Sequence, residues 1–256
     1  MTTPSPGRTV DVRTPRIHDP AKAAILMTTT QTQNPNLSTP PASTAGTTRI
    51  GAGFGLAAVV LLMAGFALMA SADAVHTSPT ESIVGFYSDP DQTMKYAGGL
   101  ISCVGLLLLL PFIATMADRV RDLPGSTAQL AGAAYVIICL PSEAAGAAAL
   151  WLGAHDGDAS SIVALNALRA FSYYTALLAL AGFLVAVGVG GLTTGRLSRW
   201  MAWSAVGIGA VLAVGVVLAG TGLADIASLL ALAWIVAVSI ALLRRPEPVA
   251  VADVRR

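Results

Sequence analysis

The chain has 256 residues, of which 55% are hydrophobic and only 11% are charged, and its formal net charge is +1. Soluble domains carry about 25% charged residues, so this chain lacks the polar side chains that would cover a water-exposed surface of its size. The small net charge gives no basic field for nucleic acid, which is excluded as a partner. The apolar residues stand in long runs separated by short charged stretches, as in proteins that cross a bilayer several times.

The chain begins with a Thr/Pro-rich stretch, residues 1–48, which holds seven of the 14 prolines and no sustained apolar pattern. Such a stretch buries too little surface to offset the entropy of ordering, so we expect a disordered tail. It is not a signal peptide, because its apolar patch, Ala23–Met27, is shorter than the roughly 7–15 residues that such a peptide needs.

Six apolar segments follow the tail, and each is long enough for an α-helix to cross a hydrocarbon core about 30 Å thick. Helices are predicted because open strands would leave backbone groups unpaired in lipid, and these runs lack the alternation of a barrel strand. We place the segments at about 50–70, 96–117, 128–152, 165–191, 200–220 and 224–243. The predicted fold is all-α: a polytopic membrane protein with a six-helix transmembrane domain at 49–245, followed by a short tail at 246–256.

The loop between the first two predicted spans, residues 71–95, is the longest and contains Ser78-Pro79-Thr80-Glu81. This sequence matches a capping box with Pro at the first helical position. We therefore expect a short amphipathic helix from Pro79 to about Tyr87, which lies on the membrane surface or plugs the outer mouth of the bundle.

Basic residues segregate to one side of the predicted bundle. If both termini are cytoplasmic, 13 of the 15 basic residues fall in the tails and inner loops, and only Lys95 and Arg169 fall on the outer half. Inner loops of membrane proteins are enriched in Lys and Arg, so we predict that both termini are cytoplasmic. We interpret Lys95 as an anchor at the outer interface.

Small residues recur every fourth position in two of the predicted spans, which is typical of closely packed helices. They are Gly51 and Gly55 in the first span, and Ala205, Gly209 and Ala213 in the fifth. Trp234 lies in the middle of the sixth span, away from either interface, so we expect it to pack inside the bundle.

Four short motifs are distributed along residues 50–245: Phe86-Tyr87, Asn166-Ala167-Leu168, the turn from Gly195 to Trp203, and Leu242-Leu243-Arg244-Arg245. They resemble a widespread family of bacterial six-span membrane proteins of unknown function. The resemblance implies the six-helix fold and the bacterial plasma membrane as location, and it implies no activity. The chain departs from that family at Ser198, where we expect Pro, and at Arg169, where we expect an acidic residue.

Ionisable residues inside the spans are the best candidates for a site, because each costs about 2.5–3.5 kcal/mol at a helix centre on insertion scales. Glu143 lies in the third predicted span and Arg169 in the fourth, toward the outer side of both. Asn166, Arg169 and Tyr173 are spaced i, i+3, i+7 and share one helical face. The sequence thus predicts that Glu143, Arg169, Asn166 and Tyr173 form either a buried ion pair or a ligand-binding site.

Three interpretations of this cluster stay open. The pair can fix which helices are neighbours, as a buried ion pair does. It can line an outward-facing cavity for a small polar or amphipathic ligand, or relay a proton. Alternatively, Arg169 can reach the outer interface while Glu143 is protonated.

The sequence shows no catalytic set, cofactor motif or metal-ligand spacing, and Cys103 and Cys139 fit small core residues. We therefore predict a structural or accessory membrane protein, not an enzyme, whose partners are the lipid bilayer and a membrane protein or a second copy of the chain. One alternative is a small carrier or binding protein for an amphipathic or small polar ligand at Glu143 and Arg169. Another is an intramembrane enzyme that uses Glu143 as acid or base.

Overall fold

The computed structural model describes residues 44–69, 78–89, 92–155, 157–218 and 221–244. These residues form seven α-helices, and no strand occurs among them. Six of the helices are long and apolar enough to cross a membrane, which confirms the all-α prediction and the six predicted spans. They are α2 (Thr44–Met69), α4 (Gln92–Val120), α5 (Asp122–Ala154), α6 (Ala159–Thr194), α7 (Arg199–Val217) and α8 (Leu223–Leu243).

Four helices, α2, α4, α5 and α6, begin several residues earlier than their apolar segments predicted. At α6 the first turn is capped, which lets the helix continue through polar residues. α6 starts at Ala159, and the side chain of Asp158 accepts hydrogen bonds from the backbone N–H groups of Ser160 and Ser161, at 2.9 and 3.1 Å. The hydroxyls of the same two serines also donate to Asp158, and these bonds lower the pKa of its carboxyl group to about 2. α4 and α5 likewise begin at residues 92 and 122.

α2 also begins earlier than expected, at Thr44, so the last residues of the predicted tail at 1–48 are helical. The rest of that tail and the predicted tail at 246–256 lie outside the described residues.

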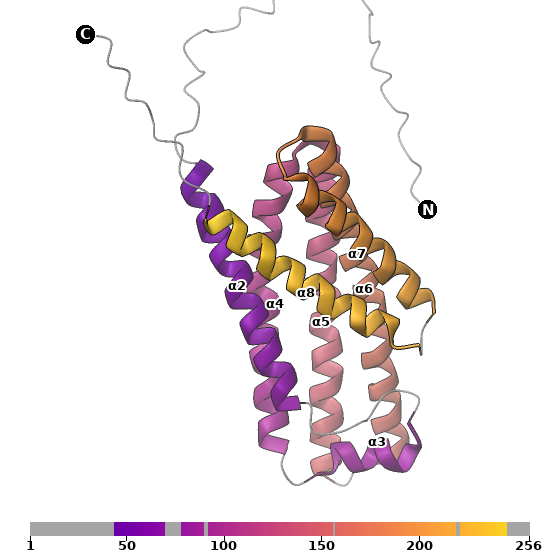
Figure 1. The fold of residues 1–256 in the computed structure, drawn as a ribbon. Coiled ribbons are helices and arrows are strands. Elements are labelled where there is room, and N and C mark those ends of the chain that lie inside the picture. The colour runs from indigo at the N-terminus through magenta and orange to yellow at the C-terminus, as the bar shows by residue number, and fades with distance from the viewer. Residues whose placement is uncertain (1–43, 70–77, 90–91, 156, 219–220, 245–256) are drawn as a thin grey trace, which may run out of the picture. The chain divides into compact units, whose positions relative to one another are not determined.

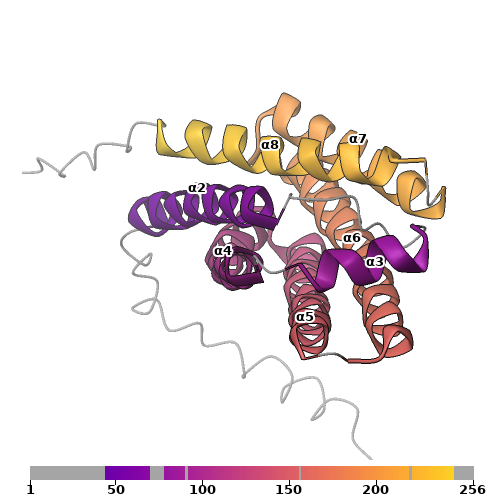
Figure 2. The ribbon, with the colours of Figure 1, turned by 90° about the horizontal axis from the view of Figure 1, so that it is seen from below.

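Each long helix packs on the next in chain order, and α8 returns to pack on α2. The six helices therefore form a closed bundle, which Figure 2 shows from one end. Its interior holds aromatic and large aliphatic side chains that are almost fully buried, among them Phe112, Phe183, Leu184 and Ile235. The fold is thus one core surrounded by helices, with apolar side chains also on the outside, such as Leu100, Leu130 and Phe171.

The helices differ in length, and this difference shapes one end of the bundle. α5 and α6 have 33 and 36 residues, whereas α7 and α8 have 19 and 21. α8 crosses the face of the bundle obliquely, and its first residues lie short of the end where the short helix α3 (Thr80–Tyr87) lies (Figure 1). We call this end, formed by α3, the start of α6 and the last turns of α5, the α3 end.

The seventh helix, α3 (Thr80–Tyr87), confirms the short helix predicted in the first loop. Pro79 is its N-cap residue, where the sequence had predicted Ser78 at that position and Pro79 as the first helical residue. Such a difference of one residue is usual at helix ends.

Close helix packing depends on the small residues that the sequence singled out. A Cβ atom added to Gly51 would lie 1.9 Å from Thr115 Oγ1 on α4, and one on Gly55 would lie 2.6 Å from Phe112 on α4 and from Ser239 on α8. Gly209 lies close to α6, and a Cβ atom added to it would lie 2.9 Å from the carbonyl oxygen of Ala181. The predicted packing faces of these two spans are confirmed.

Trp234 packs inside the bundle, as the sequence predicted. Trp234 is 3% exposed, and its Nε1–H donates to the Met201 carbonyl at 3.2 Å and to Ser204 Oγ at 3.1 Å, so it joins α8 to α7. Trp151, Trp200 and Trp203 are more than half exposed. Trp151 lies near the α3 end and the other two at the start of α7, which fits two interfacial belts.

The packing of α2 on α4 predicts a position-specific effect of adding one methyl group. Gly65→Ala would place a Cβ 2.6 Å from the Gly98 carbonyl, while Gly53 on the same helix has no atom within 4 Å of that position. We expect Gly65→Ala to destabilise the bundle by about 1–3 kcal/mol and Gly53→Ala to cause no loss. Thermal unfolding of both variants in detergent measures the difference, and equal melting temperatures would contradict this account of the packing.

Candidate functional site

The helix α3 covers the ends of α5 and α6 and sends one aromatic side chain between them. Ile83 and Tyr87 lie one turn apart on its buried face and pack on Ala149, Leu150 and Ile162. Tyr87 is 1% exposed, and its hydroxyl donates to Asn166 Oδ1 on α6 at 2.9 Å. α3 thus plugs this end of the bundle and contacts a residue of the predicted site directly.

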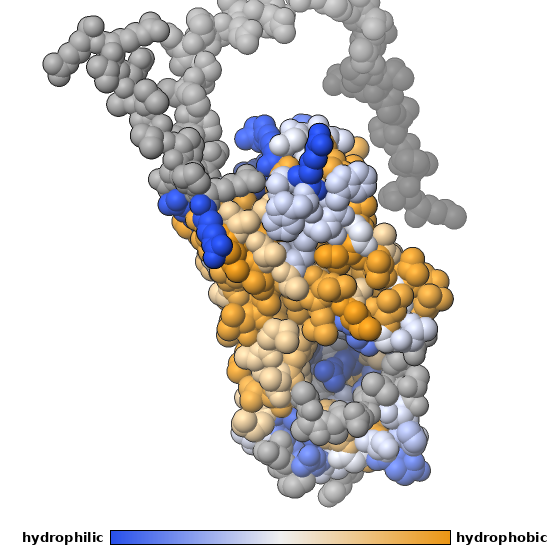
Figure 3. All heavy atoms as spheres, in the orientation of Figure 1, coloured by the Kyte–Doolittle hydropathy of each residue, from blue (hydrophilic) through white to orange (hydrophobic). Residues whose placement is uncertain are grey.

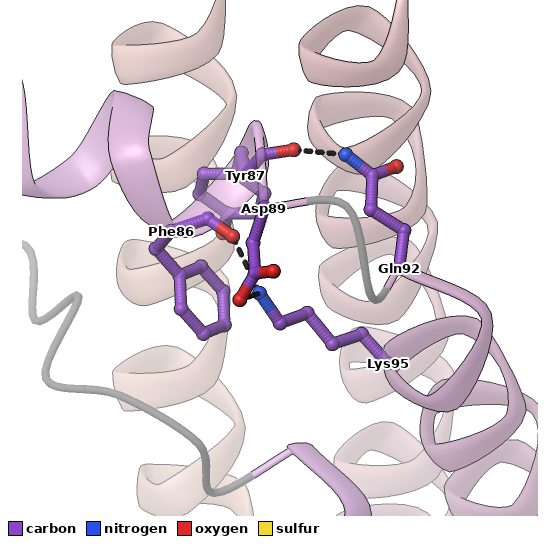
Figure 4. Close-up of polar contacts among 5 residues, drawn as sticks. All are labelled: Phe86, Tyr87, Asp89, Gln92 and Lys95. Carbon is purple, nitrogen blue, oxygen red and sulfur yellow. Dashed lines mark hydrogen bonds and ion pairs between the residues drawn. The ribbon is translucent and has the colours of Figure 1, made fainter.

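Two residues from the first turn of α4 hold the C-terminal end of α3, as Figure 4 shows. Lys95 Nζ donates to the Phe86 carbonyl at 2.6 Å and forms an ion pair with Asp89 at 3.2 Å, and it lies 4.2 Å from the centre of the Phe86 ring. Gln92 Nε2 donates to the Tyr87 carbonyl. A cation beside the unpaired carbonyls of a helix C-terminus is favourable.

Lys95 is therefore not the interfacial anchor that the sequence predicted, because it is only 3% exposed. Its position depends on how α3 folds back onto α4, which spacing along the chain does not reveal. The one indication in the sequence was Asp89, an acidic residue six positions before Lys95 that could form an ion pair with it.

The last turn of α5 is shaped to receive α3. A Cβ on Gly153 would lie 2.2 Å from the carbonyl oxygen of Tyr87, so only glycine permits this approach. The position of Tyr87 is thus fixed by α3, α4, α5 and α6 together.

Arg169 contacts neutral groups. Its Nη1 donates to Tyr87 Oη at 3.4 Å, its Nη2 lies 4.0 Å from Met69 Sδ, and its aliphatic part passes 3.1 Å from the position of a Cβ on Gly146. Its backbone carbonyl accepts a hydrogen bond from Ser142 Oγ on α5 at 2.9 Å. The guanidinium group is therefore positioned between α5, α6 and α3.

Glu143 comes from α5, next to Ser142, and its Oε2 lies 3.7 Å from the position of a Cβ on Gly99 of α4. Among the residues the structure describes, none forms a hydrogen bond with its carboxylate or an ion pair within 4 Å of it. Glu143 and Arg169 are thus near each other without being in contact.

Two cavities meet at these charges. The first, of about 250 Å³, is mostly apolar and lies under α3 between α4 and α5. Besides Glu143 and Arg169 it is lined by residues that include Phe86, Tyr96, Leu100, Cys103, Leu140 and Leu150. We call it the apolar cavity.

The second, which we call the polar cavity, has a volume of about 390 Å³ and lies among α2, α5, α6 and the first turns of α8. Glu143 and Arg169 line it together with Phe66, Ser142, Asn166, Tyr173, Tyr174, Asp225 and Ser228. Figure 3 shows a hollow on this face below α8, with hydrophilic surface inside it. The short α8 does not extend over this part of α5 and α6 (Figure 1).

All four predicted site residues line the polar cavity, but they do not form one contact network. Tyr173 donates to Ser228 Oγ on α8 at 3.3 Å, whereas Asn166 accepts from Tyr87. Asn166 is 3% exposed, and its Nδ2 has no hydrogen-bond partner among the described residues. A buried donor without an acceptor costs about 1–3 kcal/mol, so this amide is suited to a ligand.

Sequence reasoning missed Tyr87, Lys95, Asp225 and Ser228 as parts of this site. Tyr87 belongs to the separate short helix α3, Lys95 belongs to the first turn of α4, and Ser228 is a small polar residue within an apolar span. No group of three or more His, Cys, Asp or Glu residues in the described part of the chain is arranged to hold a metal ion.

Comparison of the chain with protein-family models, curated proteins and solved structures finds no match. The resemblance to bacterial six-span proteins therefore stays a prediction.

The contacts of Lys95 predict that it holds α3 in place. Lys95→Met removes charge-assisted hydrogen bonds worth about 1.5–3 kcal/mol, so amide hydrogen exchange in Ile83–Ser88 should rise at least about tenfold. Met94→Ala, at a half-exposed neighbouring position, is the matched control. Unchanged exchange in Lys95→Met would show that the apolar contacts of Ile83 and Tyr87 suffice.

Proposed function

We propose that this chain is a multi-pass plasma-membrane protein that binds, or carries, a small amphipathic ligand at Glu143 and Arg169. The observation that carries the proposal is the position of these two charged side chains beside two cavities. Both line an apolar cavity and a polar cavity, and neither is within 4 Å of an opposite charge among the described residues. Unpaired charges at a cavity are available to a ligand.

A purely structural ion pair is less well supported. A buried pair avoids most of its desolvation cost only with close geometry and further hydrogen bonds, and Glu143 and Arg169 are not in such contact. The structural or accessory role favoured by the sequence gives no reason for a cavity on each side of these residues. We retain the prediction that the chain is not an enzyme.

Helix lengths support a position of the site near the membrane surface. α8, with 21 residues, is about 31 Å long and matches the hydrocarbon core. The Tyr173–Ser228 hydrogen bond puts Tyr173 level with the second turn of α8. Arg169 and Asn166 lie one and two turns further toward the α3 end, where charges cost less than at the bilayer centre.

The charge distribution supports an outward-facing site. Among the described basic residues, Lys95 and Arg169 are the two at the α3 end, and the others lie at the opposite end. They are Arg49, Arg119, Arg121, Arg196, Arg199 and Arg244. By the positive-inside rule the α3 end and both cavities face the outside, and both termini are cytoplasmic.

Fusions to reporters test this orientation. Green fluorescent protein fused after Arg245 should fluoresce, and alkaline phosphatase fused there should be inactive, because the C-terminus is cytoplasmic. The same reporters inserted after Ser88 should behave in the opposite way. An active phosphatase after Arg245 would overturn the orientation and with it the outward-facing site.

Photo-crosslinking tests ligand binding. The probes share one 12-carbon chain with a diazirine near its methyl end and differ in their heads: phosphoethanolamine, phosphate, amine or maltoside. We expect at least one probe to label the residues lining the apolar cavity, 96–103 and 140–150, in a saturable way when the protein is in lipid nanodiscs. Gly99→Leu should abolish this labelling by filling the cavity, since a Cβ there meets only Glu143 Oε2, at 3.7 Å.

The matched control is Gly207→Leu on α7, where a Cβ meets no atom within 4 Å and Gly207 lines neither cavity. This variant should label like the unmodified chain. If none of the four probes gives saturable labelling, or if Gly99→Leu labels equally, the proposed function is wrong.

A further inference from the structure

The residues that line the polar cavity fall into two sets, which differ in charge and in hydrogen-bonding groups. In the first set, Arg169 and Asn166 come from the same face of α6, three residues apart. The Tyr87 hydroxyl lies between them, since it accepts from Arg169 Nη1 and donates to Asn166 Oδ1. That arrangement uses the Asn166 oxygen and leaves its N–H groups without an acceptor.

Arg169 and Asn166 therefore offer only donors to the cavity. A guanidinium group with spare N–H groups beside a buried amide N–H fits an oxyanion such as a phosphate or a carboxylate. We therefore assign Arg169 and Asn166 to the anionic group of a ligand.

The other residues that line the polar cavity include carboxylates and aromatic rings. Glu143 contributes a carboxylate without a hydrogen-bond partner among the described residues, and Asp225 on α8 contributes another. Phe66, Tyr173 and Tyr174 line the same cavity. Carboxylates together with aromatic faces fit an ammonium group, which gains from both kinds of contact.

The apolar cavity continues from these charges into a space that suits a hydrocarbon chain. It shares Glu143 and Arg169 with the polar cavity, and Leu100, Leu140, Ala144 and Ala147 lie along its length. Leu100, Ala144 and Ala147 are exposed on the outside of the bundle, so the cavity borders the lipid between α4 and α5.

We infer that the ligand is a zwitterionic amphiphile with one hydrocarbon chain. Its anionic group binds Arg169 and Asn166, and its ammonium group binds the carboxylates of Glu143 and Asp225. Its hydrocarbon chain occupies the apolar cavity. This inference rests on the proposed binding function and names the chemical class of its ligand. Entry from the bilayer between α4 and α5 follows from the exposed border of the apolar cavity.

The four photoreactive probes with different heads test the ligand class in the unmodified protein. We expect the phosphoethanolamine head to reach half-saturation at a concentration at least about tenfold lower than the phosphate, amine or maltoside heads, because it gains a charged contact that each of them lacks. Phosphoethanolamine without a hydrocarbon chain should compete with the photoreactive probe at least about tenfold more weakly than a phosphoethanolamine that carries the 12-carbon chain.

Substitutions at the two charges then assign the two halves of the head. Glu143→Gln should remove the preference for phosphoethanolamine over phosphate, and Arg169→Gln should remove its preference over the amine. Asp225→Asn provides a third variant at an exposed position, where loss of folding is not expected, and it should weaken binding of the amine and phosphoethanolamine heads alone. Melting temperatures of all variants are measured alongside.

The outcomes separate this inference from the proposed function. If no probe labels the apolar cavity, both are wrong. If the probes label the apolar cavity but the phosphate, amine or maltoside head binds as well as the zwitterionic head, the binding function stands and the zwitterionic class is wrong. If chain-free phosphoethanolamine competes equally well, the apolar cavity does not hold the chain, and the amphiphile is replaced by a small polar zwitterion.

Discussion

The difference in helix length is the constraint on which the rest of the structure depends. In hydrocarbon every backbone group must be paired inside the chain, so each crossing is a helix and its length decides where it ends. α7 and α8 match the bilayer core, whereas α5 and α6 are more than ten residues longer. The extra turns project at the α3 end without α7 and α8 beside them. The polar cavity is lined by residues of α5 and α6 and by the first turns of α8.

The projecting turns are held by α3 in place of a seventh long helix. Tyr87 occupies the space between α5 and α6, Lys95 donates a hydrogen bond to the carbonyl of Phe86 near the C-terminus of α3, and Gly153 lets the backbones of α3 and α5 approach. These contacts fix the Tyr87 hydroxyl, which in turn orients Asn166 and Arg169. The helix that closes the end of the bundle thereby also sets the donor groups of the site, so a loss of α3 would be expected to disturb binding as well as stability.

The position of Glu143 and Arg169, and not an ion pair between them, explains how the fold accommodates these two charges. Glu143 and Arg169 are only partly buried, and both line cavities. In the membrane placement that we propose, these cavities lie near the surface of the hydrocarbon core. Charges at this depth avoid most of the cost that applies at the bilayer centre. An ion pair in contact would have used the same groups for helix packing, whereas the separation seen here leaves them free for a ligand.

The sequence by itself determined the class of fold, the six spans, the short helix after Pro79 and the packing roles of Gly55, Gly209 and Trp234, because hydrophobic length and small-residue spacing act locally along a helix. It also pointed to Glu143, Arg169, Asn166 and Tyr173, since polar groups in apolar runs are conspicuous. Only the tertiary structure decided that Glu143 and Arg169 are apart, that Tyr87 and Lys95 belong to the site, and that two cavities meet there. Those features depend on how far α3 folds back and on where α8 stops relative to α5 and α6, and contacts between residues about 80 positions apart, such as Tyr87 with Asn166, leave no periodic trace in a single sequence.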